Sequence, residues 1–123
     1  MIVFDIYLIF LHFNINVSFF IFLASSRVTG LRRLSGGEIK KVRSLYQNFS
    51  EASYNSIKTY EKTTNHDVKA VEYILKDKLT ALGAGDSVEW VHFGLTSQDI
   101  NNTAFPMAIR DAVNNIYLPL LRN

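Results

Sequence analysis

The 123 residues allow one domain of modest size. The chain has no cysteine, which excludes disulfides, thiolate nucleophiles and cysteine-ligated zinc, and which fits a reducing compartment. Thirteen basic and eleven acidic residues leave a net charge of +2, which is too balanced to predict a nucleic-acid partner. We therefore expect a single domain in the cytoplasm, with no nucleic acid bound.

The first expected element is an apolar run over residues 1–24 that holds no lysine or arginine. Its length equals that of a bilayer span, but Asp5, His12 and Asn16 would be costly in lipid, so a membrane location is disfavoured. Its residues are also those that AT-rich codons produce. Three interpretations stay open: a membrane anchor, a non-native translated segment covering residues 1–33, and a buried hydrophobic helix.

The sequence from residue 34 to 123 predicts a partial domain made of helices. Apolar side chains recur at helical spacing in three runs, 38–49, 51–62 and 64–82. Ser50 is expected to cap the second run, and Thr64 or Asn65 the third. In the third run, Glu72 and Lys76 stand in the order that favours an ion pair across one helical turn.

A last helix is expected to begin after Thr96 or Ser97. Its predicted buried face consists of Ile100, Ala104, Met107, Ala108, Ala112 and Ile116. Pro106 lies inside this run and lacks a backbone donor, so it should kink or split the helix. Because no segment after Ser50 alternates as a strand does, the predicted fold class is all-α.

Two polar clusters, Asn65-His66-Asp67 and Thr96-Ser97-Gln98-Asp99, stand where predicted helices begin. A helix start presents unpaired N–H groups and the positive end of a dipole, which suits a carboxylate or phosphate. The same residue types are also ordinary helix caps. Composition and spacing leave both interpretations open.

The combination of "TTNHDVKAVEY" with "HFGLTSQDINNTA" some thirty residues later resembles the adenylosuccinate lyase family, within the fumarase/aspartase superfamily. The resemblance covers about residues 34–123. Fumarases and aspartases carry a Ser-Ser-Asn-Asp form of the second block, and argininosuccinate lyases an Arg-Ser-Arg-Asn-Asp form. The block here therefore disfavours another lyase of the superfamily.

The resemblance implies an all-α, N-terminal helical domain that runs into the first helix of a central helical bundle, truncated here. It implies β-elimination of fumarate from adenylosuccinate, giving AMP. It also implies elimination from the succinylated aminoimidazole carboxamide ribotide (SAICAR), giving AICAR, in purine nucleotide biosynthesis. The family needs no cofactor or metal, and its members are homotetramers.

The resemblance also assigns site residues. Thr96 and Ser97 would bind the succinyl part of the substrate, while Asn65, His66 and Asp67 would line its pocket. His66 would assist the catalytic acid without being the acid.

The family's acid and base, in a Thr-His-Gly-Gln block and a Gly-Ser-Ser loop, are missing from this chain, as is its N-terminal Arg-Tyr pair. We therefore expect an incomplete and inactive fragment. The alternative function is a non-catalytic helical module, anchored to a membrane through residues 1–24.

Overall fold

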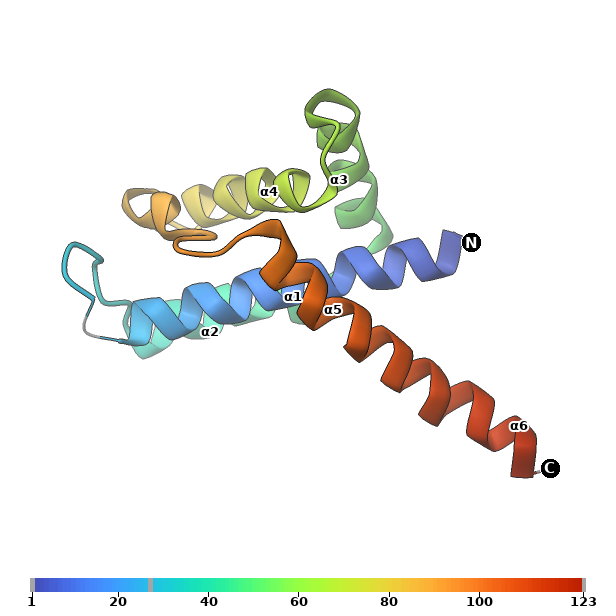
Figure 1. The fold of residues 1–123 in the computed structure, drawn as a ribbon. Coiled ribbons are helices and arrows are strands. Elements are labelled where there is room, and N and C mark those ends of the chain that lie inside the picture. The colour runs from blue at the N-terminus through green and yellow to red at the C-terminus, as the bar shows by residue number, and fades with distance from the viewer. Residues whose placement is uncertain (1, 27, 123) are drawn as a thin grey trace.

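The computed structural model describes residues 2–26 and 28–122, with side chains from residue 5 onward, and in this part the chain is helical with no strand. The all-α prediction is confirmed. The α-helices are α1 (Ile2–Ser25), α2 (Gly36–Gln47), α3 (Glu51–Thr64), α4 (Asp67–Ala81), α5 (Ser97–Ala112) and α6 (Leu118–Arg122) (Figure 1). A 3-10 turn, Gly85–Trp90, follows α4, and a π-helical turn, Val113–Tyr117, joins α5 to α6.

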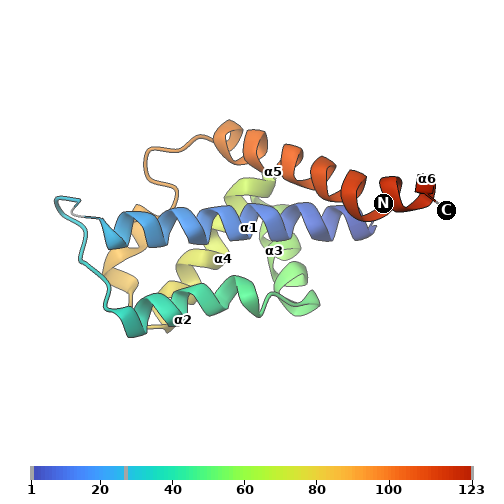
Figure 2. The same cartoon turned by 90° about the horizontal axis from the view of Figure 1, so that it is seen from below.

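Helix α1 lies at the centre, with α5 on one side and α2 and α4 on the other (Figures 1 and 2). Phe13, Val17 and Phe20 are completely buried in the main core, where each side chain contributes about 1.5–3 kcal/mol. By length and apolar composition alone, residues 5–25 would also suffice to cross a membrane. In the structure the segment is a helix with one face in the core, and 39% of its most apolar window is buried. Whether it is native sequence, and whether it anchors the chain in a membrane, stay predictions.

Polar groups of α1 find partners on neighbouring helices. The Asp5 carboxylate accepts a hydrogen bond of 2.6 Å from the Tyr54 hydroxyl and lies 3.4 Å from the Lys58 ammonium group. The Tyr7 hydroxyl donates to Asp111 of α5. These contacts tie the start of α1 to α3 and α5.

The cap of α3 agrees with the sequence and the cap of α4 does not. Ser50 caps α3 as predicted, since its hydroxyl accepts the Ser53 N–H at 3.3 Å. The prediction of Thr64 or Asn65 as the cap of α4 is wrong, because His66 occupies that position. Asn65 instead ends α3 in the left-handed conformation, with φ of 50°. That turn moves the next helix start one residue further on.

The predicted Glu72–Lys76 ion pair is also wrong. Glu72 is buried and its carboxylate lies 2.7 Å from the Lys69 ammonium group, one turn earlier on α4. Lys76 lies 3.3 Å from Glu89 of the 3-10 turn. Glu72 thus pairs at the other favourable helical spacing, three residues apart, while the fold provides Lys76 with a partner outside α4.

Helix α5 runs unbroken from Ser97 to Ala112, so of the two predicted outcomes at Pro106 the split does not occur. The predicted kink stays a prediction. Pro106 and Asn102, whose carbonyl loses its partner, are both exposed, so water can satisfy that oxygen. The irregular turn comes later, where the Leu118 N–H bonds to the carbonyl five residues back. It ends two residues before Pro119, which has no N–H to continue the ladder.

The inner face of α5 is as predicted in its first three turns, where Ile100, Ala104 and Ala108 are buried and Met107 is half-buried. Burial of Ala112 and Ile116 was predicted wrongly, because the helix here extends past the other helices (Figure 1). The exposed large side chains form what we call the C-terminal apolar stripe: Phe105, Ile109, Val113, Ile116, Tyr117, Leu120 and Leu121.

The packing of α1 predicts opposite outcomes for two of its phenylalanines. Phe13→Ala should lower the free energy of unfolding by about 3–5 kcal/mol, because it leaves a cavity in the core. Phe22→Ala should change it by no more than about 0.5 kcal/mol, since this ring is 63% exposed. Urea unfolding followed by circular dichroism measures both. Equal, small effects would contradict the core role of α1.

Candidate functional site

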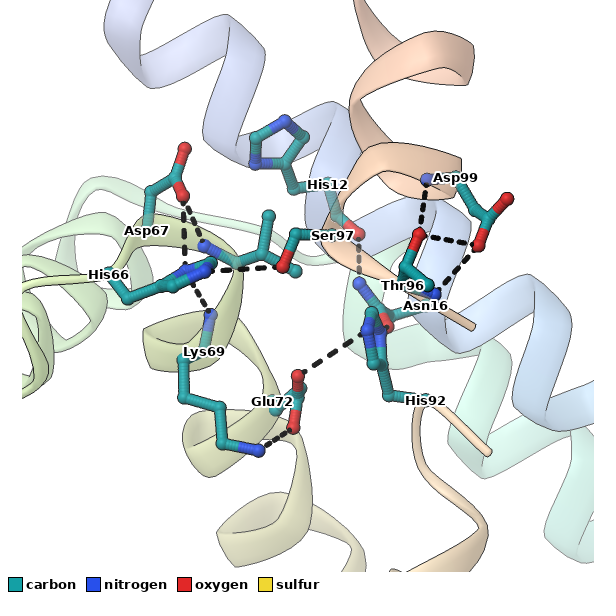
Figure 3. Close-up of polar contacts among 11 residues, drawn as sticks. His12, Asn16, His66, Asp67, Lys69, Glu72, His92, Thr96, Ser97 and Asp99 are labelled. Carbon is teal, nitrogen blue, oxygen red and sulfur yellow. Dashed lines mark hydrogen bonds and ion pairs between the residues drawn. The ribbon is translucent and has the colours of Figure 1, made fainter. Parts of the chain in front are cut away.

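The two polar clusters meet in the structure, although the residues in contact, His66 and Ser97, are 31 positions apart in the sequence. His66 Nε2 of the first cluster lies 3.2 Å from Ser97 Oγ of the second (Figure 3). His66 caps α4, and Ser97 is the first residue of α5. The contact therefore joins two helix starts, each with unpaired N–H groups.

The hydrogen bonds of His66 define its neutral form. Its Nδ1 accepts the Lys69 N–H at 3.3 Å, which places the proton of the neutral ring on Nε2. The Nε2–H group then donates to Ser97 Oγ. A second proton, on Nδ1, would face the Asp67 carboxylate 3.4 Å away. The ring can thus exchange a backbone contact for an ion pair when it becomes charged.

Thr96 and Ser97 have different roles in the local structure. Thr96 forms a capping box with Asp99, whose carboxylate accepts the Thr96 N–H at 2.7 Å and the Thr96 hydroxyl at 2.8 Å. These bonds, the backbone one above all, hold the pKa of Asp99 below its usual value. Among the described residues only His66 bonds the Ser97 hydroxyl, and as a donor. The hydroxyl proton of Ser97 is therefore free for a ligand.

The electrostatics of the site suit recognition of an anion by neutral donors. Asp67 and Asp99 lie in the first turns of their helices, where their charges offset the positive dipole ends. The nearby cation, Lys69, is paired with Glu72. In the described residues the groups available to a carboxylate are thus the Ser97 hydroxyl, backbone N–H groups and, when protonated, His66. No three His, Asp or Glu side chains in this part gather as metal ligands.

Asn65 lies beside His66 in the chain but faces a different surface. It lines an open hollow with Lys58, Glu61 and Lys62 of α3. In the part of the chain that the structure describes, no hydrogen bond joins its side chain to His66 or Ser97. The structure thus brings His66 and Ser97 together, with Asp67 and Thr96 adjacent in sequence, and leaves Asn65 at the edge. The substrate-binding roles of these residues stay predictions.

His92, which composition and spacing do not single out, connects three parts of the fold near the site. The amide of Asn16 donates to the His12 carbonyl at 2.9 Å, so its oxygen accepts from His92 Nδ1 at 3.1 Å. The other ring nitrogen faces the Glu72 carboxylate at 3.6 Å. Burial lowers the pKa of His92, and the charge of Glu72 opposes that effect.

His92 has a left-handed backbone, with φ of 64°. This conformation reverses the chain between the 3-10 turn and the start of α5, and so helps to place Ser97. His92 is the first residue of the "HFGLTSQD" motif, and this place could have marked it as a candidate site residue. Its φ angle and its contacts with α1 and α4 could not be read from the sequence, because they arise from tertiary packing.

The capping box generates a pH-dependent prediction. A carboxyl group with a lowered folded-state pKa stabilises the protein above its unfolded pKa of about 3.9, and this contribution is lost as the pH falls through the folded value. Wild type should therefore be more stable than Asp99→Asn at pH 7, and the gap should close as the pH falls below about 4. Urea unfolding of both proteins between pH 7 and 2.5 tests this; a gap independent of pH would contradict it.

Comparisons with known proteins bear on the same residues. A family model described as Lyase matches residues 32–123, which include both polar clusters. The adenylosuccinate lyase of Dictyostelium discoideum is 42% identical over 116 residues, covering 89% of this chain and 25% of the relative. The enzymes of Vibrio cholerae and Escherichia coli K12, also adenylosuccinate lyases, are 49% and 47% identical, over 62% and 60% of this chain and 17% and 16% of the relatives.

The chain thus spans a quarter or less of the length of these relatives. The alignment with the Dictyostelium enzyme covers more of this chain than residues 34–123 alone supply, so it extends into the apolar N-terminal segment. The family model covers most of the chain and contains both halves of the candidate site. The predicted resemblance to adenylosuccinate lyases is confirmed, and the chain belongs to the lyase family.

Proposed function

We propose that this chain supplies part of the substrate site of an adenylosuccinate lyase. The reaction is β-elimination of fumarate from adenylosuccinate, giving AMP, and from SAICAR, giving AICAR. The observation that carries the proposal is the 3.2 Å contact between His66 and Ser97, which makes one site from the two motifs. The names of the relatives, all adenylosuccinate lyases, support it.

In this proposal Ser97 binds a carboxylate of the succinyl group. The free hydroxyl proton of Ser97 and the N–H groups at the start of α5 are donors fixed in place before the substrate arrives. Such donors stabilise charge that develops on a carboxylate as the neighbouring carbon loses a proton. Thr96 acts chiefly by holding this turn through its capping box and contributes to the same pocket.

His66 acts beside Ser97 as an assistant to proton transfer. Its Nε2–H group, donated to Ser97 in the present arrangement, can turn to the leaving nitrogen or to a phosphate oxygen. Asp67 stabilises the charged ring through Nδ1. The resemblance also assigns Asn65 to the pocket, although in this structure it lines the separate hollow on α3. The proton-removing base and the main acid come from segments of the full-length enzymes that have no counterpart in these 123 residues.

We further propose that residues 34–123 are the lyase N-terminal domain and the start of its central bundle. Residues 1–33 form a divergent extension of that domain. The protein acts in the cytoplasm. In the homotetramers implied by the resemblance, bundle helices would cover the C-terminal apolar stripe. An exposed face with seven large apolar side chains is typical of a protein–protein contact.

A chimera tests the role of Ser97. This chain is joined to the remainder of the Dictyostelium enzyme, and kcat/KM for adenylosuccinate is measured. Ser97→Ala should lower kcat/KM by about 10²-fold or more, because one preorganised donor is lost. Ser56→Ala, an exposed serine on α3, is the matched control and should leave turnover unchanged. Full activity of the Ser97→Ala chimera would refute the assignment.

The apolar stripe predicts self-association of the isolated chain. Sedimentation velocity should show species larger than the monomer as the concentration rises, because Ile116 and its neighbours are exposed. Ile116→Glu should shift the distribution toward monomer, whereas Asn114→Glu, which adds the same charge at an exposed polar position, should shift it less. A chain that stays monomeric at all concentrations would contradict this.

A further inference from the structure

His12 is a buried histidine without a hydrogen-bond partner in the described part of the chain. It lies on α1, outside the residues matched by the family model, and is 1% exposed. Neither ring nitrogen makes a hydrogen bond. A buried polar nitrogen without a partner is destabilising, and an apolar side chain of similar size would avoid that cost. The presence of an imidazole here therefore points to a role other than stability.

The neighbours of His12 connect it to the candidate site. The charge of Asp67 acts on the ring, and Asn101 of α5 lies beside it. Asn101 Oδ1 is itself buried without a partner. Asp67 directly follows His66, and Asn101 stands one helical turn after Ser97, on the same side of α5. His12 is thus adjacent to both turns that carry the His66–Ser97 contact (Figure 3).

We propose that His12, on α1, is a positioning residue that sets the separation of His66 and Ser97. Its ring lies beside the N-terminal ends of α4 and α5, where it presents a polar edge to Asp67 and Asn101 without completing a hydrogen bond. The importance of that separation rests on the function proposed above. The apolar N-terminal segment would then contribute a polar group that acts on the site.

The test uses the full chain and needs no ligand. His12→Leu should raise the melting temperature by several degrees, because a polar group without partners is replaced by an apolar one. It should also shift the His66 ring and Ser97 amide signals in ¹H–¹⁵N spectra. His12→Gln, which keeps a donor and an acceptor, should return these signals toward wild type. Asn101→Ala should shift them from the α5 side.

Ile9→Val is the control, because Ile9 is equally buried on α1 but lies in the main apolar core, and this change should leave the His66 and Ser97 signals in place. The proposal is overturned if His12→Leu lowers the melting temperature as an ordinary core deletion does, or if the two signals stay at their wild-type positions. Titration of wild type with fumarate tests the proposed function separately from the positioning role of His12. Absence of fumarate-induced shifts at Ser97 would refute the proposed function and leave the His12 result unaffected.

Discussion

Helix α1 packs against α2, α3, α4 and α5, and each of these helices buries apolar side chains in a core that α1 shares. Helix α5 contacts α4 far less than it contacts α1, so the position of α5 depends on α1. Because α4 and α5 both pack on α1, the start of α5 lies next to the start of α4. The most apolar segment of the chain, which has no basic residue, fixes the relative positions of its most polar clusters.

The site that results is a junction of two helix starts, and most of its hydrogen bonds serve the helices themselves. Thr96 and Asp99 satisfy each other, and His66 satisfies an N–H group of α4. A capping role in the fold is thus compatible with the binding role proposed for these residues. The local bonds fix the turn that carries Ser97, whose hydroxyl proton has no acceptor among the described residues. Preorganisation of this kind requires little reordering when a charged group arrives.

Local properties of the sequence predicted the helices, the Ser50 cap and the inner face of α5 as far as Ala108, because spacing and capping chemistry act over a few residues. The resemblance assigned both clusters to one substrate site; the structure brings His66 and Ser97 into contact, and the site itself stays a prediction. The partners of Glu72, the exposure of Ile116 and the contacts of His12 and His92 could not be predicted, since they depend on which elements meet in space. Long-range contacts decide the partner of Lys76, which pairs with Glu89, and the place of His92, which faces Glu72 and Asn16.

Two residues other than glycine have positive φ angles in the described chain, Asn65 and His92, and both border the site. Such backbone is disfavoured for most side chains but open to asparagine and glycine. Position 65 can therefore accept a small set of residues at little conformational cost. Position 92 must satisfy the same backbone and also present an imidazole to Asn16 and Glu72, two requirements that few side chains meet together. Sequence variation in this protein should consequently be narrowest at a loop position, outside the helices that form its core.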